Sequence, residues 1–172
     1  MDFQGIYDRL KEQGAAGMQE ANLPRLPDPA DKKDKGRGGD PYVLVDPAQI
    51  CAFMDLAKKD ERLHFEILAD LSASDPAVDA ENFWVIYQLL SVKHRHRLMV
   101  KCSIPKSDPR IDTISGINRA AGWHERECSE MFGITFNGHP DPRNILLPDD
   151  WVGFPLRKDY EFPKEYQGIS CI

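Results

Sequence analysis

Residues 83–104, FWVIYQLLSVKHRHRLMVKCSI, decide the fold of this 172-residue chain. Phe83 to Leu90 is apolar on both faces, as is typical of a central strand. Leu98 to Ile104 is predicted to be the returning strand, and the basic run Lys93 to Arg97 predicts the hairpin tip between them. A sheet built on this hairpin needs further strands and a covering layer, and the flanking sequence supplies both.

Upstream of the hairpin, the pattern predicts a strand, a helix and another strand. Tyr42 to Val45 forms the first strand, and Asp46-Pro47 then offers an N-cap with proline at the first helical position. The next apolar residues have the spacing of one buried helical face: Ile50, Phe53, Met54 and Ala57. Residues 64–70 are predicted to form a strand that carries Phe65, Ile67 and Ala69 on one side.

Downstream, two helical pieces are predicted, residues 114–121 and 123–132, broken near Gly122 and ended by Gly133. The element order β-α-β-β-β-α predicts the α+β class, a small mixed or antiparallel sheet with helices packed on one face. Residues 42–136 would form this domain. Residues 1–41 would be an N-terminal amphipathic helix and a flexible linker, whose prolines, glycines and mixed charges detach that helix from the domain.

Residues 137–172 are predicted to be a long extended C-terminal tail, because their prolines and glycines prevent long helices and central strands. Disordered tails are depleted in large apolar residues, yet this segment carries many, among them Ile145, Leu146, Leu147, Trp151, Val152, Phe154, Leu156, Tyr160, Phe162 and Tyr166. An extended segment cannot bury these side chains against itself. They must lie either on the chain's own domain or on a partner protein.

Composition excludes several classes of protein. The net charge of −6 argues against nucleic-acid binding, which needs a basic face. No apolar run approaches the length of a membrane span or of a signal-peptide core, so neither secretion nor insertion is expected. The dispersed cysteines (Cys51, Cys102, Cys128 and Cys171) fit free thiols better than disulfides or an iron–sulfur cluster. Because the only glycine cluster lies in the linker, no nucleotide loop is expected either.

Two features of residues 123–132 suggest chemistry. His124 and Cys128 are four residues apart, the spacing of two zinc ligands on a helix, although neither His139, His94 nor His96 is placed by the sequence as a third ligand. Ordinary helical residues are the competing interpretation.

The charged triplet Glu125-Arg126-Glu127 is the second feature. Successive helical positions turn by about 100°, so three adjacent charges cannot all face solvent. At least one is expected to be half-buried and paired, unless all three are solvated. The tail offers partners in Arg143, Arg157, Lys158 and Asp159, and a carboxylate–arginine bridge would fix its path.

Residues 123–134, WHERECSEMFGI, resemble the W-Y-E-R-E-x-x-D-M-F-G-I signature of the 30 kDa subunit family of respiratory complex I, in its bacterial form part of the proton-translocating NADH–quinone oxidoreductase. Residues 138–146, GHPDPRNIL, and 153–160, GFPLRKDY, resemble its G-H-P-D-L-R-R-I-L and G-H-P-L-R-K-D-[FY] blocks. The likeness runs in order from about Tyr42 to Ile169. His124, Glu130 and Phe154 replace the usual tyrosine, aspartate and histidine, which a scaffold tolerates better than a catalytic centre does.

The resemblance implies a non-catalytic subunit of a respiratory-chain translocase that oxidises NADH, passes electrons through FMN and iron–sulfur clusters to quinone, and pumps protons. The chain itself would bind no FMN, cluster, quinone or metal. Its implied partners are the quinone-site subunit and the neighbouring subunits of the peripheral arm, with neither nucleic acid nor a membrane span of its own. Its implied location is peripheral, on the cytoplasmic face of the bacterial inner membrane.

No catalytic or cofactor-binding residue is expected. The expected signature and interface residues are Trp123, Glu125, Arg126, Glu127, Glu130, Phe132, Gly133, Gly138, His139, Pro140, Asp141, Arg143, Pro155, Leu156, Arg157, Lys158, Asp159 and Tyr160. Three alternatives remain open: the equivalent subunit of a membrane-bound hydrogenase or other-donor dehydrogenase, a stand-alone metalloenzyme using His124 and Cys128, and a self-contained structural domain.

Overall fold

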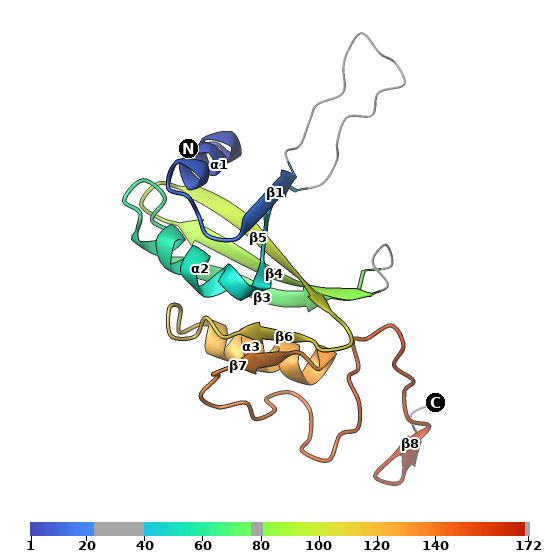
Figure 1. Ribbon diagram of the computed structural model, residues 1–172. Helices are drawn as coiled ribbons and strands as arrows, with labels where there is room; N and C mark the ends of the chain where they lie inside the picture. Colours follow the sequence, from blue (N-terminus) through green and yellow to red (C-terminus); the bar gives the residue numbers. More distant parts are fainter. Residues whose placement is uncertain (23–39, 77–80, 171–172) are drawn as a thin grey trace, which may run out of the picture.

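The computed structural model describes residues 1–22, 40–76 and 81–170 (Figure 1). Its centre is a five-stranded sheet in the order β1-β2-β5-β4-β3. Neighbouring strands are antiparallel except β2 and β5, which are parallel. The predicted α+β class with a mixed sheet is therefore confirmed. The strands of this sheet are β1 (Met18–Asn22), β2 (Tyr42–Val45), β3 (Ile67–Ser74), β4 (Asn82–Ser91) and β5 (His96–Pro105).

Within the described residues three α-helices accompany the sheet, and Figure 1 shows α2 and α3 on the same side of it. The Asp46 side chain accepts the Ala48 N–H at 3.0 Å and opens a 3₁₀ turn that leads into α2, as the Asp-Pro pair predicts. No helix within the described ranges is long and apolar enough to cross a membrane. The helices are α1 (Phe3–Glu12), α2 (Ile50–Lys59), preceded by the turn η1 (Pro47–Gln49), and α3 (Ala121–Phe132).

Two smaller strand pairs complete the described structure. The parallel pair β6 (Arg110–Asp112) and β7 (Thr135–Asn137) flanks α3 in the sequence. The antiparallel pair β8 (Glu165–Tyr166) and β9 (Ile169–Ser170) lies near the C-terminus.

The predicted hairpin is the framework of the sheet. β4 and β5 pair without interruption from Asn82–Pro105 to Ser91–His96. Alternate side chains of both strands are buried, and the residues between them are half-buried for most of the length. The sheet therefore buries one face completely, and β5 rather than β4 occupies its middle position.

Two sequence predictions were wrong in detail. In β3 the inward residues are Leu68, Leu71 and Ala73, whereas Ile67 is exposed. Phe65 is buried but precedes the strand, which begins at Ile67, and a register shift between Leu68 and Asp70 then breaks the simple alternation. Residues 115–120 form successive turns instead of a helix, and α3 begins only at Ala121. The Ile114 N–H donates to the Glu125 side chain at 2.8 Å, so α3 holds the preceding segment in addition to that segment's own turn hydrogen bonds, such as the one from the Asn118 N–H to the Ile114 carbonyl.

The N-terminal helix is not detached from the domain. Ile6 and Leu10 are buried in the common core, and β1 extends the main sheet by pairing with β2. The predicted flexible linker lies mostly in residues 23–39, outside the described residues. A polar linker does not determine where the segment before it packs. The apolar side chains of α1 pack on the core.

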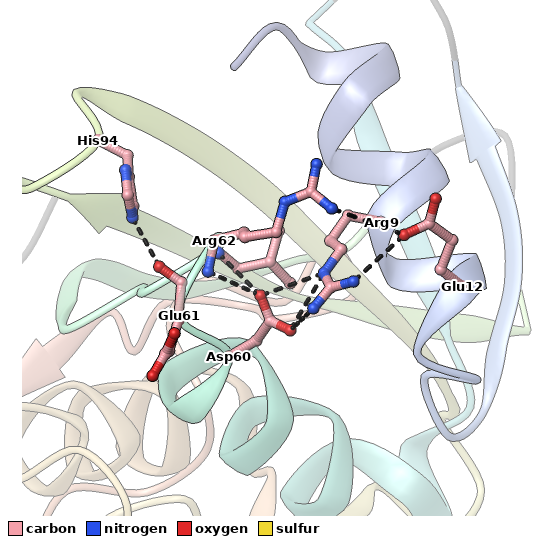
Figure 2. Close-up of polar contacts among 7 residues, drawn as sticks. Arg9, Glu12, Asp60, Glu61, Arg62 and His94 are labelled. Carbon is pink, nitrogen blue, oxygen red and sulfur yellow. Dashed lines mark hydrogen bonds and ion pairs between the residues drawn. The ribbon is translucent and has the colours of Figure 1, made fainter.

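A partly buried ion pair fastens α1 to the end of α2 (Figure 2). Arg9 donates from Nε and Nη2 to Asp60, with 2.7 Å between Nη2 and Oδ2. The N–H groups of Arg62 and Leu63 donate to the same carboxylate at 3.0 Å each. Burial alone would raise the pKa of Asp60, but these donors together hold it below its usual range.

We expect Leu10→Ala to lower the free energy of unfolding by about 2–5 kcal/mol, because the change leaves a cavity where a fully buried side chain stood. Urea unfolding followed by tryptophan fluorescence measures the effect, since all three tryptophans lie outside residues 1–22. Lys11→Ala, exposed on the same helix, is the matched control and should change stability by less than about 0.5 kcal/mol. An unaltered transition in Leu10→Ala would mean that α1 folds independently.

The Arg9–Asp60 pair should also make folding sensitive to acid. Because the pKa of Asp60 is lower in the folded state, its stabilising contribution is complete above the unfolded pKa of about 3.9 and is lost as pH falls through the folded pKa. We expect Asp60→Asn to lower stability at neutral pH and to reduce the slope of unfolding free energy against pH below about pH 4. Urea titrations at each pH test this, with the more exposed Asp55→Asn as control. An unchanged slope would contradict it.

Candidate functional site

The helix α3 and the tail that follows it bring the predicted signature residues together. Figure 1 shows the described part of the tail, residues 137–170, running in loops beyond α3 to the short β8–β9 pair. The signature residues on α3 are Trp123, Glu125, Arg126, Glu127, Glu130 and Phe132. The remaining ones lie between Gly133 and Tyr160.

Glu125 is the most deeply buried carboxylate of α3, with 1% of the residue exposed. The Thr113 hydroxyl donates to one of its oxygens, and the Ile114 N–H donates to the other at 2.8 Å. Burial raises the pKa of Glu125, while these two donors and His139 act in the opposite direction. Glu125 therefore ties the first half of α3 to the segment just after β6, and its role is inside the domain.

His139 anchors the beginning of the tail over the start of α3. Its Nδ1 accepts the Asp141 N–H at 3.1 Å, which places the proton of the neutral ring on Nε2. Nε2 in turn donates to the Gly122 carbonyl at 3.0 Å and lies 3.7 Å from the Glu125 carboxylate. The side chain is only 5% exposed, so this part of the tail is integral to the fold.

Glu130, the second buried carboxylate of α3, holds the middle of the tail. Three consecutive backbone N–H groups, those of Ile145, Leu146 and Leu147, converge on its two oxygens at 2.9–3.1 Å. Successive N–H groups that point at one anion form a compact anion-binding arrangement. Here the anion is the Glu130 side chain, so α3 holds the tail through the main-chain N–H groups of the tail.

Arg126 provides the third attachment, and its side chain is 11% exposed. It donates from Nε to the Arg143 carbonyl at 2.7 Å and from Nη2 to the Asn144 carbonyl at 3.2 Å. Arg126 therefore connects α3 to the tail mainly through carbonyl oxygens rather than through the expected carboxylate–arginine bridge, and the nearby Asp141 carboxylate, 3.5 Å away, was not among the expected partners. Asp141 is paired with Arg143, whose hydrogen bonds lower the pKa of Asp141 to about 2.

Gly133 and Arg157 close the C-terminal end of α3. Gly133 has a φ of 71°, and a Cβ there would lie 2.5 Å from Arg157 Nη2 and 2.6 Å from the Phe154 ring. Both the backbone conformation and the available space therefore demand glycine. Arg157 donates to the Phe132 carbonyl at 2.6 Å, and its guanidinium lies 4.4 Å and 5.0 Å from the rings of Phe154 and Phe83.

The remaining signature residues make main-chain contacts or face outward. The Leu156 N–H donates to the Met131 carbonyl at 3.1 Å, and the Lys158 N–H donates to Asp75 at 2.9 Å. The Tyr160 hydroxyl donates within the tail to the Val152 carbonyl. Pro155 is half-buried, and the exposed residues of the predicted set are Trp123, Glu127, Gly138, Pro140, Arg143, Leu156, Lys158 and Asp159.

Several large apolar side chains around these attachments are more than half exposed: Trp123, Leu146, Val152, Leu156, Phe162 and Ile169. We call these six residues the outward apolar set. The tail thus lies on its own domain, as expected if it wraps that domain. Several of its apolar side chains nevertheless remain uncovered, as expected if it binds a partner protein. Exposed apolar groups of this number are typical of surfaces that bind another protein.

The His124–Cys128 pair is not arranged as a ligand pair. Cys128 is buried, with Sγ 3.9 Å from the Leu71 carbonyl, and burial raises the pKa of its thiol. A metal requires the thiolate, which this environment disfavours. His124 lies instead beside Asp70, with 3.7 Å between Nδ1 and Oδ1. Across the described ranges, no group of three or more His, Cys, Asp or Glu side chains could hold a metal ion.

Comparison with known proteins shows which family the chain resembles. Residues 43–166 match the family model of the respiratory-chain NADH dehydrogenase 30 kDa subunit. The chain is 46% identical over 127 residues to an NADH-quinone oxidoreductase subunit of Chloroherpeton thalassium, covering 73% of this chain and 51% of that protein. It is 35% identical over 172 residues to the same-named protein of Acidothermus cellulolyticus, covering 98% and 86%. The chain thus spans about half the length of the Chloroherpeton relative.

Solved structures show the same fold. A trypsin-resistant fragment of Nqo5 superposes with a TM-score of 0.54 at 23% identity, over 82% of this chain and 99% of the fragment. A chain of the membrane-bound sulfane sulfur reductase, an archaeal respiratory membrane complex, gives a TM-score of 0.63 at 22% identity, over 92% and 84%.

We expect Glu130→Ala to release the middle of the tail, because three N–H groups lose their common charged acceptor. Losing about 2 kcal/mol of local stability would speed hydrogen exchange at Ile145, Leu146 and Leu147 about 30-fold. Exchange measured by NMR on the full chain tests this. Glu127→Ala, exposed on the same helix, is the control and should leave the three rates unchanged. Equal exchange in both variants would show that the tail is held elsewhere.

Proposed function

The chain belongs to the 30 kDa subunit family of respiratory-chain NADH dehydrogenase, and from this we propose that it serves as the non-catalytic 30 kDa subunit of a membrane-associated NADH–quinone oxidoreductase. In that role it holds the quinone-site subunit in position, so that electrons pass from NADH through FMN and iron–sulfur clusters to quinone. The observation that carries the proposal is the tail, whose main chain is fixed by α3 while its apolar side chains face outward.

Energetics support docking through the outward apolar set. Burying a large apolar side chain stabilises a complex by about 1.5–3 kcal/mol, and a few such residues normally dominate an interface. The attachments made by Glu130, Arg126 and Arg157 hold the tail in place before binding. A tail ordered in advance loses less conformational entropy when it meets the quinone-site subunit.

The chain itself is proposed to bind no FMN, iron–sulfur cluster or quinone. Cys102 and Cys128 are buried in apolar surroundings that raise the pKa of their thiols, and cluster ligation requires thiolates. Glu125, the most strongly buried acid of the region, is already matched by donors from its own chain. The proposed location is peripheral, on the cytoplasmic face of the bacterial inner membrane.

A related respiratory complex with another electron donor is the second candidate, favoured by the fold shared with the archaeal sulfane sulfur reductase chain. A mass-spectrometric inventory of the native assembly distinguishes the two. The presence of NADH- and FMN-binding subunits supports the first, and their replacement by another donor module supports the second.

We expect the combined change Leu146→Ser, Val152→Ser and Phe162→Ser to weaken binding to the purified quinone-site subunit at least about 100-fold, because three apolar contacts are lost together. The dissociation constant is measured with the full chain, and circular dichroism confirms the fold. Val92→Ser, a similarly exposed apolar residue at the hairpin tip, is the control and should bind like the unmodified chain. Unchanged binding by the triple variant would exclude these residues from the interface.

A further inference from the structure

The main sheet has a second face that the helices leave open. The buried residues of α1, α2 and α3 join the inward side chains of the strands in one core cluster. Side chains of the opposite face alternate with these along each strand, and no helix in the described part of the chain lies over them. We call the central residues of this surface the open face: Tyr42, Leu44, Trp84, Ile86, Met99 and Lys101.

Lys101 is the unusual member of the open face. Strand register places it between Leu44 and Ile86, and its ammonium lies 4.1 Å from the Tyr42 ring and 4.7 Å from the Trp84 ring. Burial lowers its pKa, against the weaker influence of Asp40. Among described residues, no carboxylate or carbonyl oxygen forms a hydrogen bond or ion pair with the ammonium. Two aromatic faces contact the ammonium, which leaves its three N–H donors available to acceptors outside the described residues.

Charge along β5 indicates the kind of surface that would fit. Arg97 lies opposite Leu90, on the same face of β5 as Lys101. The two cations therefore project from the same side of the sheet. An apolar sheet face is ordinarily covered by a helix or a second sheet. An ammonium inside an apolar surface is best matched by a carboxylate inside the opposing one.

We propose that the open face is a second docking surface, and that it takes an amphipathic helix of a neighbouring subunit whose apolar side carries a carboxylate opposite Lys101. The inference rests on the proposed function only in assuming that neighbouring subunits exist. The open face and the outward apolar set are separate surfaces, since α3 and the tail attachments belong to the other side of the sheet. The chain would then join two neighbours.

Lysine acetylation of the purified native complex and of the isolated chain tests whether the open face is covered. We expect Lys101 to be acetylated at least ten times more slowly in the complex than in the isolated chain. Lys59, whose side chain is 74% exposed on α2, reports on the labelling of a lysine outside the open face. Equal labelling of Lys101 in both samples overturns the proposal, as does protection in the isolated chain. Absence of the chain from the complex would instead refute the proposed function.

A carbodiimide applied to the same complex tests the chemistry of the partner. It joins an amine to a carboxylate in contact with it, forming an amide between Lys101 Nζ and the carboxyl carbon while the reagent takes up the displaced oxygen as a urea. Mass spectrometry should find Lys101 linked to Asp or Glu in a helix of another subunit. Links only to Asp40, links to a second copy of this chain, or no link at all would each overturn the proposal.

Charge variants give an independent measure of the same contact. Lys101→Glu should cause loss of the cross-linked neighbour from the complex while the quinone-site subunit is retained, and Lys101→Arg should keep both. Circular dichroism confirms that each variant folds. Retention of the cross-linked neighbour by Lys101→Glu contradicts the proposal.

Discussion

Two buried carboxylates on one helix determine how the C-terminal half of the chain is arranged. An unmatched buried charge costs several kcal/mol, so Glu125 and Glu130 must each be surrounded by donors. Glu125 takes its donors from the segment that precedes α3, and Glu130 takes its donors from the tail that follows. The helix thus supports both irregular segments.

This arrangement separates the main chain of the tail from its side chains. Between Arg143 and Leu147 the main-chain groups face α3, where the Glu130 carboxylate and the Arg126 guanidinium bind them, and the Leu146 side chain is left exposed. A tail bound through apolar contacts to its own domain would have no such surface to offer. The polar residues of α3 therefore hold the tail in place, and the exposed apolar side chains of the tail stay available for binding.

The sequence was sufficient for the central hairpin and for α2, and insufficient for β1, for the inward face of β3 and for the attachments of the tail. The β4–β5 hairpin and α2 were predictable because their apolar spacing repeats with the period of each element. The inward face of β3 was missed because a register shift leaves no mark in the apolar pattern. The partners of Glu130 were missed because backbone N–H groups are the same at every residue, so only the path of the chain shows which of them converge. The position of Arg126 was enough to predict a contact with the tail, but it could not predict which carbonyl oxygens accept its hydrogen bonds.

The parallel pairing of β2 with β5 affects the order in which the strands can join the sheet during synthesis. Val43 pairs with Val100, whereas β3, β4 and β5 are joined consecutively by antiparallel pairing. During synthesis, residues 1–45 leave the ribosome before β5 exists, so β2, and β1 on its outer edge, have no sheet to join. The meander of β3, β4 and β5 has the shorter loops to close and can form first. β1 and β2, although translated before β5, are thereby the last strands to join the sheet.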